Sequence, residues 1–168
     1  MTTRATAQTP EDLTRLFVER ANDADAEGAA ALTLLRAQGL TSLIEARVSR
    51  LYEIKGPLSS NQVLQATKDL LCDAVTQEHR AVTPSPAPMN GANFWRVEVW
   101  LKPTVTDPVG ETVRDAIADM GLPKPESVRC ALVYRLVGRA NKAALEKAVT
   151  KTLANPLIHR AVVSEAHP

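Results

Sequence analysis

Aromatic residues, cysteines and glycines are scarce in this chain of 168 residues, and its charges nearly cancel. Aromatic side chains make up only 4% of the residues, so Leu, Val, Ile and Ala must form most of the hydrophobic core. The formal net charge of +1 argues against the strongly basic surface of a nucleic-acid-binding domain. The hydrophobic residues, 45% of the chain, never form the run of about 18 that a transmembrane helix needs. We therefore expect no nucleic-acid or membrane partner. The polar N-terminus, which lacks an apolar signal core, predicts a cytoplasmic location.

The same scarcity removes the common catalytic motifs. The seven glycines never cluster into a phosphate-binding loop, and no Gly-x-Ser-x-Gly turn is present. Cys72 and Cys130 have no spacing suited to a metal site or a redox pair, so we interpret both as reduced structural thiols. These absences argue against a stand-alone enzyme. We expect no catalytic residue, metal ligand or cofactor-binding residue in the chain.

What the chain does contain is an internal repeat. When Asp107 is aligned with Asp25, turn and strand residues of the two halves coincide without a gap, and we call this superposition the repeat alignment. The coinciding pairs also include Gly28 and Gly110, Arg47 and Arg129, Tyr52 and Tyr134, and Gly56 and Gly138. Turns restrict the choice of residue, so these matches indicate a shared backbone path. Because a repeat of about 80 residues buries little surface alone, we predict that the two repeats pack as a pseudo-dimer.

A proline-rich segment separates the repeats. Pro84, Pro86 and Pro88 stand at alternate positions and are followed by Asn90-Gly91, a pattern typical of an extended linker that ends in a turn. This pattern predicts a flexible N-terminus at residues 1–12, a first repeat at 13–83, a linker at 84–93 and a second repeat at 94–166.

Each repeat is predicted to have the order β-α-β-α-β, in an α+β fold with mainly antiparallel sheets and helices on one face. In the second repeat, Trp95 to Leu101 alternates as a half-buried strand, with Trp100 facing away from Trp95. Asp107-Pro108 starts a helix, with Asp as N-cap and Pro at the first helical position. Asn155-Pro156 ends the second helix, because Asn tolerates a left-handed cap and Pro cannot continue a helix.

The two ends of the first repeat leave alternatives open. Residues 16–20 match a strand of the second repeat, whereas Thr9-Pro10-Glu11-Asp12 and the apolar residues after it are typical of a capped helix. The repeat favours the strand. At the other end, His79-Arg80-Ala81-Val82 matches His159-Arg160-Ala161-Val162. The two segments are, however, two positions closer together in the sequence than the repeat alignment requires. Either a turn differs in length by two positions, which makes the histidines equivalent, or the match is chance.

Several residues are candidates for contacts, each with a plainer alternative. Arg47 and Arg129 lie on strands otherwise rich in apolar residues, where they would bind a carboxylate across the pseudo-dimer or a phosphate on a partner, or simply be solvated. Tyr52 and Tyr134 are interpreted as core or interface anchors, and Trp100 as an interface contact or surface packing. The remaining candidates are His159, as a polar contact or an exposed strand end, and the helix caps Asp25 and Asp107 with the turn residues Gly28, Gly56, Pro108, Gly110 and Gly138.

An ordered set of segments in the second repeat is similar to a known family. The set is Val97-Glu98-Val99-Trp100-Leu101-Lys102-Pro103, Asp107-Pro108-Val109-Gly110, Val128-Arg129 and Leu153-Ala154-Asn155-Pro156-Leu157-Ile158. Over about residues 95–165 it resembles PurS, the small subunit of phosphoribosylformylglycinamidine (FGAM) synthase. The first repeat resembles the PurS-like N-terminal region of the large single-chain synthase. The chain departs from the family at Cys130-Ala131, where a Gly-Lys pair is usual, and at His159, where an acidic residue is common.

The resemblance implies a non-catalytic subunit that works in purine biosynthesis. Such a subunit bridges a PurL-type synthetase subunit, which uses ATP and Mg, and a PurQ-type glutaminase subunit, which releases ammonia from glutamine. It also places Asn155 at the family's helix end, and we take Asn155 and His159 as candidate interface or substrate contacts. Self-association of the pseudo-dimer is a further expectation. We expect the synthetase subunit to bind the strand edges and the loops after Gly56 and Gly138. Two alternatives are a split N-terminal region of a larger synthase and a small-molecule-sensing α+β module.

Overall fold

A computed structural model of the protein describes residues 13–20, 25–81 and 94–165. The predicted N-terminal segment 1–12 and the predicted linker 84–93 lie outside the described residues. Within the described ranges, no helix has both the length and the apolar character that crossing a lipid bilayer requires.

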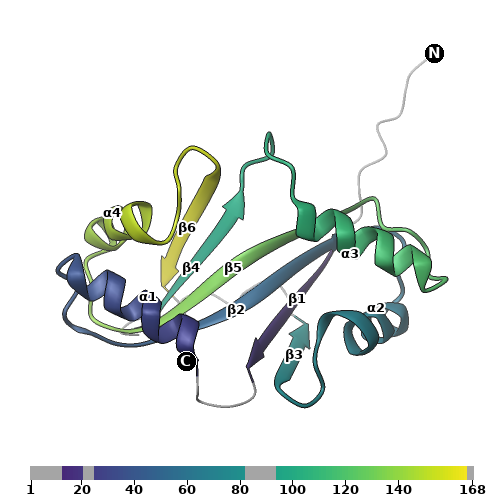
Figure 1. Ribbon diagram of the computed structural model, residues 1–168, viewed down its shortest axis with the longest axis horizontal. Coiled ribbons are helices and arrows are strands. Elements are labelled where there is room, and N and C mark those ends of the chain that lie inside the picture. The colour runs from purple at the N-terminus through teal and green to yellow at the C-terminus, as the bar shows by residue number, and fades with distance from the viewer. Residues whose placement is uncertain (1–12, 21–24, 82–93, 166–168) are drawn as a thin grey trace.

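Both halves of the chain follow the predicted order β-α-β-α-β (Figure 1). The first half contains β1 (Leu13–Arg20), α1 (Ala26–Ala37), β2 (Leu43–Lys55), α2 (Ser60–Ala66) continued by the π-helical turn η2 (Thr67–Leu71), and β3 (Gln77–Ala81). The second half contains β4 (Phe94–Leu101), α3 (Pro108–Asp119), β5 (Ser127–Gly138), α4 (Lys142–Thr152) and β6 (His159–Glu165). The first element is a strand, so the capped-helix interpretation is wrong for residues 13–20.

The six strands form one sheet in the order β3-β1-β2-β5-β4-β6, and every neighbouring pair is antiparallel. The two halves meet edge to edge through β2 and β5, whose register runs from Lys55 opposite Ser127 to Leu43 opposite Gly138. The predicted α+β class with antiparallel pairing is therefore confirmed, and the two halves share a single sheet.

The register of β2 against β5 places a pseudo-twofold axis at the centre of the sheet. Arg50 lies opposite Leu132, which is its own counterpart in the repeat alignment. On either side of this pair, Tyr52 lies opposite Cys130 and Val48 lies opposite Tyr134, so that counterparts exchange places. The two halves therefore meet as the subunits of a symmetric dimer do.

The first strands of the two halves are equivalent, but their residues correspond with a shift of one position relative to the repeat alignment. Leu16 pairs with Tyr52 in β2, and Val97 pairs with Tyr134 in β5. Because Tyr52 and Tyr134 are counterparts, Leu16 corresponds to Val97 and not to Glu98, which the repeat alignment gives. The connection from the first strand to the first helix is thus longer by one position in the second half.

The last strands return to the repeat alignment. Ala81 pairs with Leu16, and Val163 pairs with Val97, so Ala81 corresponds to Val163. His79 then corresponds to Ala161 rather than to His159. The shifted sequence match is therefore a coincidence, and the interpretation of the two histidines as equivalent residues is wrong.

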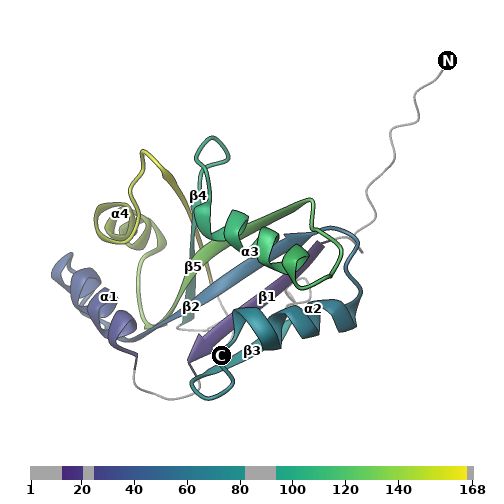
Figure 2. The same ribbon diagram turned by 45° about the vertical axis from the view of Figure 1, so that its right-hand side comes forward.

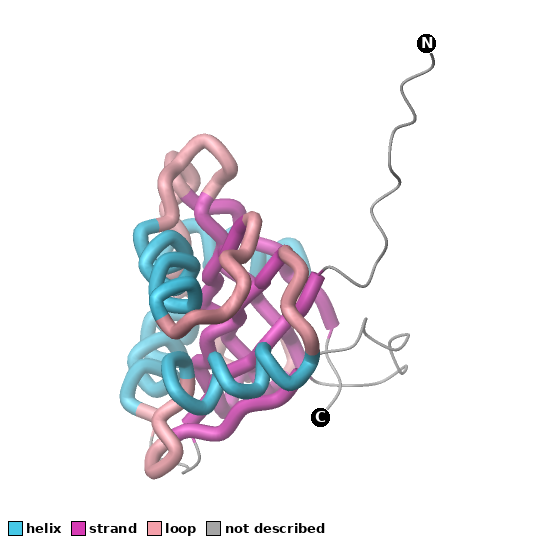
Figure 3. The backbone as a smooth tube through the Cα atoms, turned by 90° about the vertical axis from the view of Figure 1, so that its right-hand side faces the viewer, coloured by secondary structure: helices cyan, strands magenta, loops and turns pink. Residues whose placement is uncertain are grey.

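The helices cover one face of the sheet, and no described residue forms a helix on the opposite face, which we call the helix-free face (Figure 3). Helix packing crosses the boundary between the halves, since α1 packs beside α4 and α3 packs beside η2 (Figures 1 and 2). Leu35 of α1 and Leu145 of α4 are fully buried in one core. Ile54 of β2 and Ile117 of α3 share the other core. Each helix-covered core is therefore built from both halves.

Candidate functional site

An aspartate fastens the first helix of the first half to its central strand. Asp25 is the N-cap of α1, where its Oδ1 accepts a hydrogen bond of 2.8 Å from the Gly28 N–H. Its Oδ2 accepts a hydrogen bond of 2.7 Å from the Val48 N–H of β2. One carboxylate thus satisfies both a helix end and a strand N–H.

The second half repeats this arrangement at the counterpart residues. Asp107 Oδ1 accepts from the Gly110 N–H at 2.8 Å, and Oδ2 accepts from the Cys130 N–H at 2.8 Å. Pro108 follows the cap in the first turn of α3, where its missing N–H costs nothing. Both aspartates therefore have a structural role that explains their place in the repeat.

The repeated glycines lie where two stretches of backbone approach closely. A Cβ at Gly28 would stand 2.1 Å from the Ala46 backbone oxygen, and a Cβ at Gly110 would stand 2.1 Å from that of Val128. These contacts let each helix start directly on the central strand of its own half.

The glycines that end the two central strands reach across the pseudo-twofold axis. Gly56 has φ +150°, and a Cβ there would stand 3.0 Å from the Cα of Pro125 in the second half. Gly138 has φ +130°, and a Cβ there would stand 2.3 Å from the Ser42 backbone oxygen in the first half. The loops after Gly56 and Gly138 thus begin in close contact with the opposite half.

The two repeated arginines make equivalent contacts with the ends of the first strands. Arg47 Nη2 donates to the Arg20 backbone oxygen at 3.3 Å. Arg129 Nη2 donates to the Leu101 backbone oxygen at 3.2 Å. Arg20 and Leu101 are counterparts in the first strands, so both arginines hold the last carbonyl of the preceding first strand. This shared contact accounts for their presence in both halves.

Trp100 lies on the face of the sheet without helices and is nevertheless only 5% exposed. Its indole Nε1 donates to Glu98 Oε2 at 2.8 Å. The guanidinium of Arg129 lies over its ring, 4.9 Å from the centroid, a distance typical of a cation–π contact. Trp100 also shares a buried cluster with Phe17 and Leu51 of the first half, so it packs across the boundary between the halves.

The loop between β4 and α3 borders two adjoining pockets. A pocket of about 270 Å³ is lined by Trp100, Lys102 and Arg129 together with Asp107 and Cys130. A pocket of about 330 Å³ also borders Asp107 and is lined by residues of the loop, of α3 and of β5. We call these two cavities the β4–α3 pockets.

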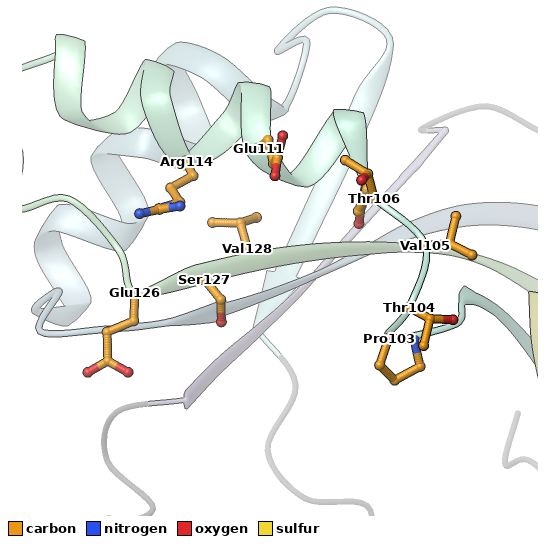
Figure 4. Close-up of a pocket in the computed structure, with 10 residues that line it drawn as sticks. Pro103, Thr104, Val105, Thr106, Glu111, Arg114, Glu126, Ser127 and Val128 are labelled. Atoms are coloured by element: carbon orange, nitrogen blue, oxygen red, sulfur yellow. The ribbon is translucent and has the colours of Figure 1, made fainter.

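The larger of the β4–α3 pockets has a polar lining. Figure 4 shows Glu111 and Arg114 on α3 above Ser127 and Val128 of β5, with Thr106 at the start of the helix. Arg114 Nε donates to the Pro125 backbone oxygen at 3.0 Å, which holds its guanidinium at the end of the pocket. Carboxylate, guanidinium and hydroxyl groups together suit a small polar ligand.

Asn155 and His159 form one turn between α4 and β6. Asn155 Oδ1 accepts from the Leu157 N–H at 3.0 Å, and the Asn155 N–H donates to His159 Nδ1 at 3.0 Å. The expected left-handed cap is wrong, because no described residue other than glycine has positive φ. Lys102 Nζ donates to the Pro156 backbone oxygen at 2.6 Å, so this turn is fixed to the loop beside the β4–α3 pockets.

Titratable side chains gather near the pseudo-twofold axis on the helix-covered face. Burial raises the pKa of the Cys130 thiol to about 11, and the neighbouring Asp107 carboxylate acts in the same direction. Burial also raises the pKa of Tyr52, with a smaller effect of Cys130, and the pKa of Tyr134, with a smaller effect of Glu27. All three groups are therefore neutral at physiological pH, which suits packing rather than nucleophilic chemistry.

The structure brings some of the predicted contact residues together and separates others. Trp100 and Arg129 line the smaller β4–α3 pocket, and Lys102 connects it to the turn of Asn155 and His159. Arg47, Tyr52 and Tyr134 line neither pocket. Glu111 and Arg114 were not predicted from the sequence, because they look like ordinary surface residues of a helix. The available signal was their spacing of three positions on one helix face next to the Asp107 cap.

Among the residues that the structure describes, no group of three or more His, Cys, Asp or Glu side chains is arranged to hold a metal ion. Comparison with protein families gives a match for residues 95–165, to PurS, described as phosphoribosylformylglycinamidine (FGAM) synthase. No curated protein matches the chain significantly.

Proposed function

We propose that the chain is a non-catalytic subunit of FGAM synthase and works in purine biosynthesis, because residues 95–165 match the PurS family of this synthase. In this proposal it bridges a PurL-type synthetase subunit and a PurQ-type glutaminase subunit. ATP, Mg²⁺ and glutamine are used by those partners, and the present chain binds none of them.

The observation that carries the proposal is the combination of the family match with the pseudo-twofold architecture. The second half is the matched domain, and the first half repeats its element order and joins it through β2 and β5. A single chain with two such halves is suited to contact two different partners at once. The residues that differ between the halves then decide which partner binds where.

The loops after Gly56 and Gly138 are the surfaces that we assign to these contacts. Each begins against the opposite half, as the contacts of Gly56 with Pro125 and of Gly138 with Ser42 indicate. Pro57 and Arg139, the first residues of the two loops, are exposed. A rigid base and an exposed tip favour binding with little loss of conformational entropy.

The test is reconstitution with the synthetase and glutaminase subunits of the same organism. We expect the three proteins to co-elute in size-exclusion chromatography, and the chain to raise FGAM formation with glutamine while leaving the rate with free ammonia unchanged. Arg139→Trp should weaken this effect, whereas Val75→Trp, at a residue that is 88% exposed in the turn before β3, should not. Failure to co-elute together with an unchanged glutamine-dependent rate would refute the proposal.

The β4–α3 pockets favour a second candidate function, the binding of a small polar effector. Thermal-shift measurements with amino acids and nucleotides test it, because a ligand at 100 times its dissociation constant stabilises a protein by about 2.7 kcal/mol. An increase in melting temperature that Arg114→Ala abolishes would support this function. A melting temperature that no tested amino acid or nucleotide changes would exclude these compounds as effectors.

A further inference from the structure

The last strand of the second half, β6, forms one edge of the sheet (Figure 1). Among the residues that the structure describes, β6 pairs with β4 on one side and with no strand on the other. Its middle residues Ala161, Val162 and Val163 are uncharged, and no proline interrupts the strand. Charged residues and prolines are what commonly protect an edge strand, so the middle of β6 is open to pairing with a further strand.

The ladder between β4 and β6 shows which backbone groups of β6 face outward. The Lys102 N–H donates to the Ile158 oxygen at 2.8 Å, whereas the His159 N–H turns away from β4 and donates to a carbonyl of the preceding turn at 2.7 Å. Backbone groups alternate in direction along a strand, so those of Ala161 and Val163 also face away from β4. The described residues provide no hydrogen-bond partner for these outward groups.

The opposite edge of the sheet, β3, has a charged residue at the corresponding place. Arg80 is the counterpart of Val162 in the repeat alignment, and its Nε lies 3.9 Å from Glu19 Oε1 on β1. Two copies of β3 paired about Arg80 would place like charges directly opposite each other, which destabilises a sheet. β3 also has only five residues, against the seven of β6. The edge of β6 is therefore the one suited to self-pairing.

The sequence of β6 is complementary to itself in the antiparallel direction. When two copies are centred on Val162, Ala161 of one copy lies opposite Val163 of the other, so that their outward backbone groups can exchange hydrogen bonds. His159 lies opposite Glu165, and both side chains point to the face on which Val163 is buried. An imidazole opposite a carboxylate is a favourable cross-strand pair, and this register overlaps the full length of both strands.

We propose that β6 pairs antiparallel with β6 of a second copy of this chain, with Val162 on the twofold axis. The pairing joins two six-stranded sheets into one and covers the unpaired β6 edge of both copies. Within the chain, β2 and β5 already meet in this way about Arg50 and Leu132, so the same kind of join occurs twice. No synthase subunit takes part in the dimer, and the β3 edges stay available to the partners of the proposed function.

Val162→Cys tests the register directly. The backbone groups of Val162 face β4, so across the proposed axis the two copies of this residue form a non-hydrogen-bonded pair. The Cα atoms of such a pair are about 4.5 Å apart, within the range that a disulfide spans. We expect a covalent dimer on oxidation with copper phenanthroline, seen in non-reducing electrophoresis. Arg80→Cys, at the counterpart residue of β3, is the matched control and should give no such band.

Ala161→Pro tests whether backbone hydrogen bonds hold the dimer. Its N–H faces outward, so proline removes an edge donor and leaves the β4–β6 ladder intact. In sedimentation velocity we expect the wild type to be a dimer at micromolar concentration, and Ala161→Pro to be a monomer with unchanged far-UV circular dichroism. His79→Pro, at the corresponding residue of β3, should remain dimeric.

Four results would overturn the proposal. They are a wild-type chain that stays monomeric at its highest soluble concentration, a dimer that persists in Ala161→Pro, a dimer that His79→Pro dissociates as well, and cross-linking of Val162→Cys no faster than that of Arg80→Cys. Should Ala161→Pro lose its circular dichroism, the cross-linking decides, because Val162→Cys removes no backbone donor. A confirmed dimer that never binds the synthase subunits would refute the proposed function and leave the β6 contact standing.

Discussion

At the scale of single residues, the repeat preserves contacts that hold backbone in place. Asp107 accepts hydrogen bonds from the Gly110 and Cys130 N–H groups, and Asp25 makes the same two contacts in the first half. A carboxylate is needed because both of its oxygens must accept. A serine or an amide side chain would satisfy the helix end and leave the strand N–H without an acceptor.

Asp107→Asn tests this requirement. The amide of Asn has one accepting oxygen, so one of the two N–H groups loses its partner, at a cost of about 1–3 kcal/mol. Urea denaturation should show this loss of stability, and Asp25→Asn should show a similar one. Asp119→Asn, at an exposed residue of the same helix that has no ion pair among the described residues, should leave the unfolding midpoint unchanged. Equal midpoints for Asp107→Asn and wild type would contradict the double-acceptor role.

The buried thiol of Cys130 predicts how stability depends on alkaline pH. Its pKa is raised from 9.0 to about 11 by burial and by Asp107, so between these values only the unfolded chain loses this proton. Unfolding then becomes easier as pH rises, and the free energy of unfolding should fall by up to ~1.4 kcal/mol per pH unit between pH 9 and 11. Tyr52 and Tyr134, whose pKa values are also raised by burial, act in the same direction.

Cys130→Ala isolates the contribution of the thiol. The fall in unfolding free energy, measured by urea titrations from pH 8 to 11, should become shallower in this variant. Val128→Ala, a change at a buried residue of the same strand without a titratable group, should lower stability and keep the wild-type slope. A Cys130→Ala slope equal to that of the wild type would show that the thiol ionises alike in both states.

The identities of single residues predicted the helix N-caps, but not the hydrogen bonds that these residues make with distant strands. Asp25 and Asp107 could be identified as N-caps because capping depends on local sequence. The second acceptor contact of each, with the strand N–H of Val48 or Cys130, depends on how helix and strand pack and left no local signal. Arg47 and Arg129 were recognised as unusual on an apolar strand, but their contact with a backbone carbonyl required the strand ends to be placed in three dimensions.

At the scale of elements, periodicity predicted the strands and helices, and the repeat decided the ambiguous first strand. The sequence did not predict which helices pack together, because apolar stripes on four similar helices fit any neighbour. The structure pairs α1 with α4 and α3 with η2, so that each pair joins the two halves. The false equivalence of His79 and His159 has a similar origin, since strand register depends on pairing partners that a local match does not contain.

Hydrogen exchange tests the crossed helix pairing. Leu145 of α4 and Leu35 of α1 lie in one core, and Ile117 of α3 lies in the other. Leu145→Ala leaves a cavity that costs about 2–5 kcal/mol, and it should speed amide exchange in α1 of the other half more than in α3 of its own half. Ile117→Ala should do the reverse, with faster exchange in η2 than in α4. Faster exchange confined to the half that carries each substitution would contradict the pairing.

At the scale of the whole molecule, the fused chain resembles two subunits whose interface has become internal. The β2–β5 register continues over almost the entire length of both strands, and both helix-covered cores need residues from the two halves. Neither half therefore has a complete core without the other. Glu53 on β2 and its counterpart Arg135 on β5 carry opposite charges, so the two halves have diverged at this position while the join itself kept its symmetry.

Cutting the chain between its halves tests whether the join depends on the covalent connection. We expect a protein with a protease site inserted in the predicted linker 84–93 to elute after cleavage at the volume of the intact chain, because strand pairing and two shared cores hold the fragments together. Leu51, fully buried on β2 opposite Ala131, is the residue to disrupt. Leu51→Lys should separate the cleaved fragments, since it puts a charge in the join, whereas Leu13→Lys, at a residue of β1 that is 46% exposed, should not. Fragments of the unsubstituted protein that part on cleavage at micromolar concentration would mean that the connection, rather than the shared sheet, keeps the two halves together.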